Sequence, residues 1–215
     1  MGASPFAHEL RALLIVNGFR GTSVYPVPVD AIHVTSYFAD AFASVWKTPA
    51  LTETVLKTRA VPRNRRLQDA IDRLVGRGLF IPTAISYSAT PTGARLAASY
   101  SINRDLANRA LEVVYADEEW RAQLDLTREV AIGIASLGHD RINQTVLADA
   151  SYSDPLLDFN TVVDLGPDDG EQSKTADANE RLAAVALRTL GQTLTPSELT
   201  AFYIRHLYPF TEVPA

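Results

Sequence analysis

The chain has 215 residues, of which 47 % are hydrophobic and 21 % are charged, as expected for a globular protein of one large or two small domains. It contains no cysteine, which excludes disulfide bonds, thiolate zinc sites and cysteine nucleophiles and favours a reducing compartment. The first ten residues lack the basic and apolar regions of a signal peptide, and the early apolar run over 12–16 is too short to cross a membrane. We therefore expect a cytoplasmic protein that does not bind membranes.

The net charge of −5 is unevenly distributed along the chain. Residues 57–77 contain seven basic and two acidic residues, whereas residues 117–215 contain 17 acidic and seven basic ones. A chain divided in this way can present a basic patch to one partner while it remains acidic as a whole.

Two amphipathic helices are predicted near the N-terminus. Apolar residues at helical spacing predict the first over 6–18, and a loop with two prolines follows over 21–28. We predict Asp30 as the N-cap of the second helix. This helix has a broad aromatic face, which is expected in the core rather than at a subunit interface. The face consists of Val34, Tyr37, Phe38, Ala41, Phe42 and Val45.

Residues 67–93 have the pattern of a recognition helix followed by a β-wing. After an irregular stretch or one short helix over 47–63, apolar positions predict a helix over 67–75 that ends at glycines. Residues 79–81 predict a short strand, Pro82 a turn, and Ile85 with Tyr87 a second strand. Thr90 and Pro91 are suited to begin an exit helix. This order is typical of a winged helix, in which the aromatic side chain of the returning strand packs beneath the wing; the alternative is a generic α+β fragment with a β-hairpin.

The C-terminal half is predicted to be mostly helical. Apolar spacing predicts helices near 106–114 and 124–135, and an acidic stretch with prolines and glycines predicts an exposed loop at about 164–176. Asp177 with Glu180 could form a capping box for a helix through residue 190, and residues 195–198 form a better one for the last helix. The predicted fold is therefore mainly α with a small β-wing. A winged helix-turn-helix domain (6–100) precedes a helical C-terminal region (101–215).

No pattern in the sequence indicates catalysis or a bound cofactor. The four histidines do not share a metal-ligand spacing, and phosphate-loop, dinucleotide-binding and serine-hydrolase motifs do not occur. The aspartates at 149, 154, 158 and 164 could in principle bind a divalent cation, but their spacing does not match a calcium loop. We expect them on a solvated acidic surface and predict neither an enzyme, a metal site nor a cofactor. A metal-dependent hydrolase that uses these aspartates is the enzymatic alternative.

The basic segment 57–77 is the candidate DNA-binding surface. Arginines at the start of the predicted recognition helix suit phosphate contact, because the helix N-terminus also favours anions. Base reading would depend on few side chains, mainly Gln68 and Arg73. The alternatives are contact with an acidic protein surface or with solvent alone. The candidate residues are Arg59, Arg63, Arg65, Arg66, Arg73 and Arg77.

Several short motifs resemble those of a known family. They lie at 10–16, 29–38, 74–79, in the Tyr87…Thr90…Gly93 exit and at 146–155. Together they are similar to the middle component of ABC-three-component systems, small winged-helix subunits that accompany an SMC-like ATPase in prokaryotic defence operons of the Lamassu type. The arrangement is also similar to that of KITE subunits.

The resemblance implies a non-catalytic adaptor in anti-phage or anti-plasmid defence. Such an adaptor would bind the SMC-like ATPase, could bridge it to an effector nuclease, and could help to hold DNA. Apolar C-terminal side chains are then candidate partner contacts, since aromatic residues are enriched in interface cores. The candidates are Phe202, Tyr203, Tyr208 and Phe210. A stand-alone winged-helix transcription regulator, which would bind a palindrome as a homodimer, is the alternative.

Overall fold

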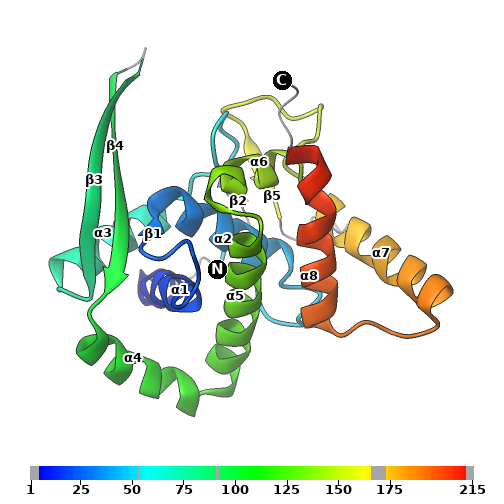
Figure 1. Ribbon diagram of the computed structural model, residues 1–215, viewed down its shortest axis with the longest axis horizontal. Coiled ribbons are helices and arrows are strands. Elements are labelled where there is room, and N and C mark those ends of the chain that lie inside the picture. Colours follow the sequence, from blue (N-terminus) through cyan, green and yellow to red (C-terminus); the bar gives the residue numbers. More distant parts are fainter. Residues whose placement is uncertain (1–4, 53, 91–92, 166–172, 212–215) are drawn as a thin grey trace.

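The computed structural model describes residues 5–52, 54–90, 93–165 and 173–211 (Figure 1). The fold is mainly helical with a little antiparallel β-structure, which confirms the predicted class at this level. Its helices are α1 (Pro5–Gly18), α2 (Val29–Ala41), α3 (Arg65–Gly76), α4 (Arg104–Ala116), α5 (Glu118–Ser136), α6 (Ile142–Leu147), α7 (Lys174–Leu190) and α8 (Pro196–Leu207). Its strands are β1 (Val27–Pro28), β2 (Thr54–Leu56), β3 (Phe80–Thr90), β4 (Gly93–Ile102) and β5 (Val162–Asp164).

Helices α1 and α2 form the centre of the hydrophobic core. Every described residue of α2 except Asp30 is buried, and its aromatic face packs inside the protein as predicted. Arg11 of α1 lies in the same interior, where it pairs with Asp40 at 3.3 Å and donates to Gln123 of α5 at 2.7 Å. Burial of this ion pair joins α1, α2 and α5 by polar as well as apolar contacts.

The first sheet has the strand order β1–β4–β3, with both pairs antiparallel. The prediction of two short strands that turn at Pro82 was wrong, because 80–90 forms one strand and the returning strand is 93–102. The chain passes through Pro82 without turning because β3 is an edge strand, where a missing N–H costs no ladder bond. A bulge lies between Thr83 and Ser86, and Ala84 has a φ of 39°.

The exit helix also begins later than expected. Residue 90 ends β3, and Pro91 lies outside the described residues. Helix α4 begins at Arg104 instead, and the side chain of Asn103 caps it by accepting from the Leu106 N–H at 3.5 Å. Extension of the hairpin to residue 102 explains the delay, since β4 occupies the predicted helix.

Two N-caps differ from the sequence predictions. Asp30 lies inside the first turn of α2, where it binds Arg63, and none of the described side chains caps this helix. Helix α7 begins earlier than predicted and is capped by Ser173 in place of Asp177. The capping box of α8 is confirmed: Thr195 Oγ1 accepts from the Glu198 N–H, and the Glu198 carboxylate accepts from the Thr195 N–H at 2.8 Å.

The C-terminal half packs against the N-terminal helices through α5. Helices α4 and α5 follow the predicted apolar spacing, and α5 contacts both α1 and α8. Short strands β2 and β5 pair residues 54–56 with 162–164, a connection that the sequence analysis missed. The buried core includes residues from both predicted domains. The division at residue 100 stays a prediction.

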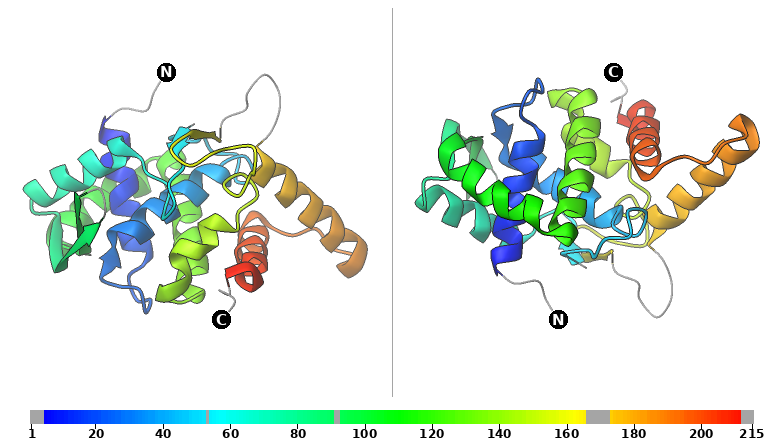
Figure 2. Two further views of the ribbon diagram at one scale, coloured as in Figure 1. Left: turned by 90° about the horizontal axis from the view of Figure 1, so that it is seen from above. Right: turned by 90° about the horizontal axis from the view of Figure 1, so that it is seen from below.

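Two elements project from this body, the β3–β4 hairpin and helix α7 (Figures 1 and 2). Of the predicted acidic loop at 164–176, residues 166–172 lie outside the described part of the chain. Within the described residues, no helix is long and apolar enough to cross a membrane.

Candidate partner and nucleic-acid interface

Helix α3 is held against the core by one face and exposes the other. Asn64 caps its start by accepting from the Leu67 N–H at 3.2 Å. Its inner face is buried, as the apolar spacing predicts, and consists of Leu67, Ala70, Ile71 and Leu74. The charged residues of α3 are therefore directed away from the core, and their partners determine what α3 can bind.

Two of the predicted DNA-binding arginines pair with one carboxylate of α1. Arg73 Nε contacts the Glu9 carboxylate at 2.6 Å, and the Arg77 guanidinium contacts the other oxygen of the same carboxylate. Glu9 is buried, so this contact fixes both arginines beside the end of α3. The single carboxylate offsets half of their charge.

Two more arginines and the lysine of the segment are engaged elsewhere. Arg63 pairs with Asp30 at 3.0 Å, and the Arg59 guanidinium lies 5.7 Å from the centre of the Phe159 ring. Lys57 is buried and donates to the carbonyl oxygens of Asp154 and Leu157 at 2.9 and 2.7 Å. These side chains attach the segment to the rest of the chain.

Arg65 and Arg66 remain exposed at the first turn of α3. Neither forms an ion pair with any residue that the structure describes. Beyond them the outer face carries acidic side chains at Asp69 and Asp72, and Gln68 donates to the Asp72 carboxylate at 3.0 Å. The basic surface is thus smaller than the sequence predicts, because Arg63, Arg73 and Arg77 pair with carboxylates within the fold and Lys57 is buried.

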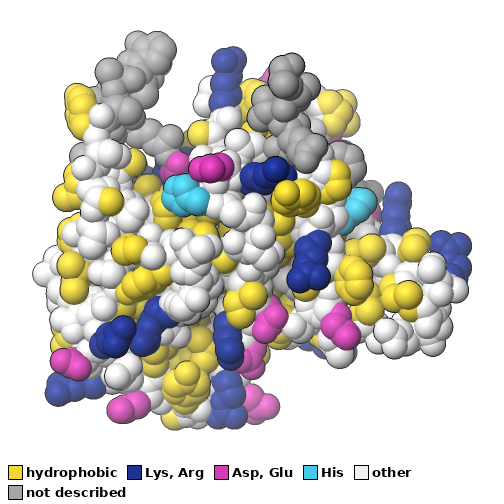
Figure 3. Space-filling model, in the orientation of Figure 1, with side chains coloured by type: hydrophobic (Ala, Val, Ile, Leu, Met, Phe, Trp, Pro, Cys, Tyr) yellow, Lys and Arg dark blue, Asp and Glu magenta, His cyan; other side chains and the backbone are white. Residues whose placement is uncertain are grey.

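The β3–β4 hairpin is long and carries little charge. Strand β3 has no charged residue, and the sequence of β4 has only Arg95. Ile81, Ile85 and Tyr87 are 46 %, 64 % and 72 % exposed. The prediction that Tyr87 packs beneath the wing was therefore wrong. In the space-filling view the hairpin shows hydrophobic and neutral side chains below its grey tip (Figure 3).

The C-terminal aromatic candidates have different environments. Phe202 and Tyr208 are 49 % and 40 % exposed, and the Arg141 guanidinium lies 4.2 Å from the centre of the Tyr208 ring. Tyr203 is buried and therefore cannot contact a partner in this fold. The side chain of Phe210 lies outside the described residues.

A buried carboxylate connects the two halves of the chain. Asp149 is completely buried and accepts five hydrogen bonds. Hydroxyl donors come from Tyr37 at 2.5 Å, Thr175 at 2.8 Å and Tyr203 at 2.8 Å. The backbone N–H groups of Ser151 and Tyr152 complete the set at 3.0 and 3.3 Å. These donors replace the water that the carboxylate loses on burial.

The Asp149 carboxylate affects the pKa of the two tyrosines that donate to it. Burial raises the pKa of the Tyr37 and Tyr203 hydroxyls, and the charge of Asp149 raises both further. Both hydroxyls therefore stay protonated and act as donors to Asp149. The sequence could not reveal this cluster, because its members lie in α2, α7, α8 and the loop after α6.

The prediction of a solvated acidic surface was wrong for two of its four aspartates. Asp149 is buried, and Asp154 is 9 % exposed and pairs with Lys174 at 2.6 Å. Asp158 and Asp164 are exposed. Among the residues that the structure describes, no group of three or more His, Asp or Glu side chains is arranged to hold a metal ion.

Comparison of the chain with models of known protein families, with curated proteins and with solved structures gives no match.

Proposed function

We propose that this chain is a non-catalytic adaptor subunit of an SMC-like ATPase complex and that it binds a protein partner through a winged-helix module. The supporting topology from α1 to β4 is helix, strand, helix, strand, helix, strand, strand, in which β1 pairs with β4 and β2 pairs with β5 in the other sheet. This order is typical of winged helices. The family resemblance of the sequence motifs supplies the kind of complex and its role in prokaryotic defence.

The hairpin is the observation that carries the proposal. A wing that lies on DNA gains affinity from lysine and arginine, because neutralised phosphates release counterions. Here β3 has no charged residue, exposes Ile85 and Tyr87, and has one edge that no other described strand pairs with. A long, apolar, unpaired edge is suited to pair with a strand of another protein.

Copurification tests the adaptor role. The chain is coexpressed with the SMC-like ATPase and the other products of its own operon, and each is assayed for stable association. Ile85→Lys with Tyr87→Lys should abolish association, because charges on the edge disfavour strand pairing. Ile132→Lys on α5, a residue 42 % exposed and away from the hairpin, is the matched control. Absence of any ATPase partner, or association unaffected by the hairpin variant, contradicts the proposal.

DNA contact is a second candidate function, favoured by the first turn of α3. Arg65 and Arg66 are exposed there and lack an ion-pair partner among the described residues. Such contacts would be to the phosphate backbone, since the outer face offers little for base reading. The lack of base-reading side chains argues against a stand-alone transcription regulator, which would have to recognise a specific sequence.

Duplex binding by the assembled complex tests the DNA contact. Arg65→Glu with Arg66→Glu should weaken binding of unrelated duplexes equally and reduce the salt slope by about two. Arg188→Glu, which reverses an exposed charge on helix α7 outside the basic segment, is the control. Unchanged affinity and slope would assign the two arginines to solvent or to a protein contact.

A further inference from the structure

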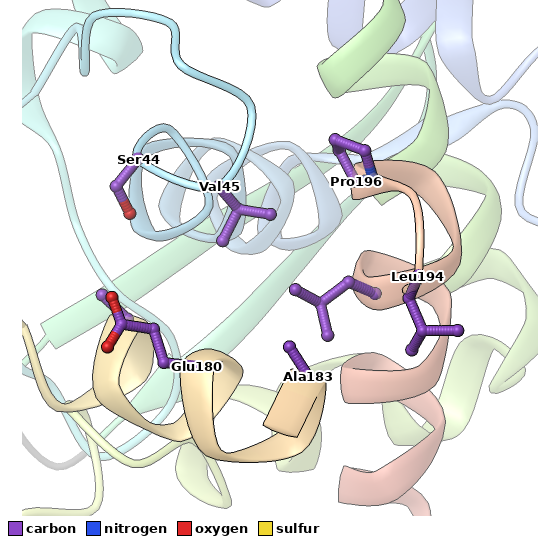
Figure 4. Close-up of a pocket in the computed structure, with 8 residues that line it drawn as sticks. Ser44, Val45, Glu180, Ala183, Leu194 and Pro196 are labelled. Carbon is purple, nitrogen blue, oxygen red and sulfur yellow. The ribbon is translucent and has the colours of Figure 1, made fainter. Parts of the chain in front are cut away.

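Two hollows on the surface differ in the side chains that line them. One, of about 290 Å³, lies between α7, the turn after α2 and the start of α8, and Glu180 is the only charged residue among the described ones that line it (Figure 4). The other, of about 380 Å³, lies where the end of α1 meets the end of α4 and the middle of α5. Two arginines, Arg20 and Arg128, and one carboxylate, Asp125, line it. This second hollow has the side chains that a charged ligand requires.

Packing of α1 against α5 holds the two arginines at the same hollow. A Cβ on Gly18 would lie 3.3 Å from the Arg128 Cα, so the backbone of α5 at Arg128 lies directly against the end of α1. Arg20 follows two residues after Gly18, in a turn that the burial of Phe19 fixes. Thr22 Oγ1 donates to the Phe19 carbonyl at 2.8 Å and stabilises the same turn. The two arginines therefore reach the hollow from elements that are packed together.

Both guanidinium groups keep their charge available for a ligand. Arg20 donates to the neutral Asn17 Oδ1 at 3.2 Å, and neither arginine forms an ion pair with Asp125 or with any other residue that the structure describes. An anion between them would reduce the repulsion of the two like charges. Guanidinium groups bind phosphate oxygens through two parallel hydrogen bonds, so a pair of arginines favours a phosphate group.

The remaining lining suits an organic ring that carries hydroxyl groups. Tyr115 is 54 % exposed, and the buried Leu124 adds apolar surface to the hollow. An exposed aromatic ring offers a surface on which a nucleobase can stack. The Asp125 carboxylate can accept hydrogen bonds from hydroxyl groups. The volume lies within the range of small-molecule sites, about 300–1,000 Å³.

We propose that this hollow binds a mononucleotide, with its phosphate between Arg20 and Arg128, its base against Tyr115 and its ribose hydroxyls toward Asp125. The phosphate and the base contribute separately, so a ligand that has only one of them binds more weakly. Every base has an aromatic face, so little selectivity among bases is expected. Because water screens the exposed arginines, we expect a dissociation constant of about 100 µM.

Titration of the full chain with AMP, followed by the amide NMR signals, tests the site. The signals that shift should belong to residues 17–22 and 124–128, and AMP should bind at least about tenfold more tightly than adenosine or inorganic phosphate. Arg20→Gln and Arg128→Gln should each weaken AMP binding about tenfold, because each removes a charge-assisted contact to phosphate. Arg188→Gln, at an exposed position on α7, is the matched control and should bind AMP as the wild type does.

A change at Tyr115 separates the base contact from the phosphate contact. Tyr115→Leu keeps an apolar side chain but removes the aromatic ring, so it should weaken AMP binding about fivefold or more. The same variant should bind inorganic phosphate as the wild type does, because phosphate has no ring to stack. A general disturbance of the fold would weaken both ligands, and the NMR spectrum of each variant shows whether it is folded.

Several results would overturn the proposal. They are AMP that shifts no signals, shifts confined to other parts of the chain, inorganic phosphate or adenosine that binds as tightly as AMP, and arginine variants that bind AMP like the wild type. The titration contains no ATPase or DNA. Its failure therefore leaves the adaptor role intact, and failure of the adaptor role leaves the nucleotide site intact.

Discussion

Replacement of the buried Asp149 carboxylate by an amide should destabilise the fold by about 2–4 kcal/mol. The carboxylate accepts five hydrogen bonds, four of them at one oxygen. In Asp149→Asn the carbonyl oxygen can keep those four, but each becomes a neutral bond about half as strong. The amide nitrogen then faces the hydroxyl of Tyr203, which must reverse its own proton.

The cost of burying the Asp149 charge opposes this loss of stability. Burial of a charge costs several kcal/mol, and the amide removes that cost. The buried carboxylate has no direct cationic partner among the described residues, so its hydrogen bonds alone compensate for the lost water. Five donors converge on Asp149 at 2.5–3.3 Å. We therefore expect the weakening of these hydrogen bonds to outweigh the burial cost that the neutral amide avoids.

Urea unfolding at neutral pH, followed by far-UV circular dichroism, measures the difference. The midpoint should fall while the m-value stays constant. Asp158→Asn is the matched control, since Asp158 is exposed, and it should change stability by less than about 0.5 kcal/mol. If Asp149→Asn is as stable as the wild type or more so, the carboxylate is a net cost and the reasoning is refuted.

Two further predictions concern pH and packing. In the folded chain the pKa values of Tyr37 and Tyr203 lie above 10.0, the ordinary value expected in the unfolded chain. The two tyrosines therefore contribute their full stabilisation below pH 10. Above that pH the free energy of unfolding falls by up to about 1.4 kcal/mol per pH unit for each tyrosine. Melting temperatures between pH 9 and about 11 should show a shallower fall in Tyr203→Phe, and an equal slope would contradict the assignment. Gly18→Ala would put a Cβ 3.0 Å from the Ala131 Cβ and should cost about 1–2 kcal/mol in thermal unfolding. Gly76→Ala meets nothing within 4 Å and should be neutral or stabilising by about 0.5–1 kcal/mol; equal effects of the two changes would contradict this account.

Local patterns predicted the helices well. The buried face of α3 and the capping box of α8 depend on residues within a few positions of one another, and both are present in the structure. The hairpin was predicted near its true position but with the wrong turn, because Pro82 signals a turn in most contexts. Only the position of β3 at the sheet edge allows the strand to continue through it.

Long-range pairings could not be predicted in this way. The basic cluster of 57–77 is a property of the sequence, but the pairing of Arg63, Arg73 and Arg77 depends on Asp30 and Glu9, which lie far away in the chain. The same holds for Asp149, since its donors come from three helices and a loop.

The sequence by itself determined a mainly helical chain without cysteine, with a basic middle and an acidic C-terminal half. Helix periodicity and caps act over a few residues, so they can be read locally. Only the tertiary structure decided which charges are paired, which aromatic residues are buried, and that the hairpin and α7 project with apolar side chains exposed. Those properties depend on which distant segments meet, and a local pattern contains no information about that.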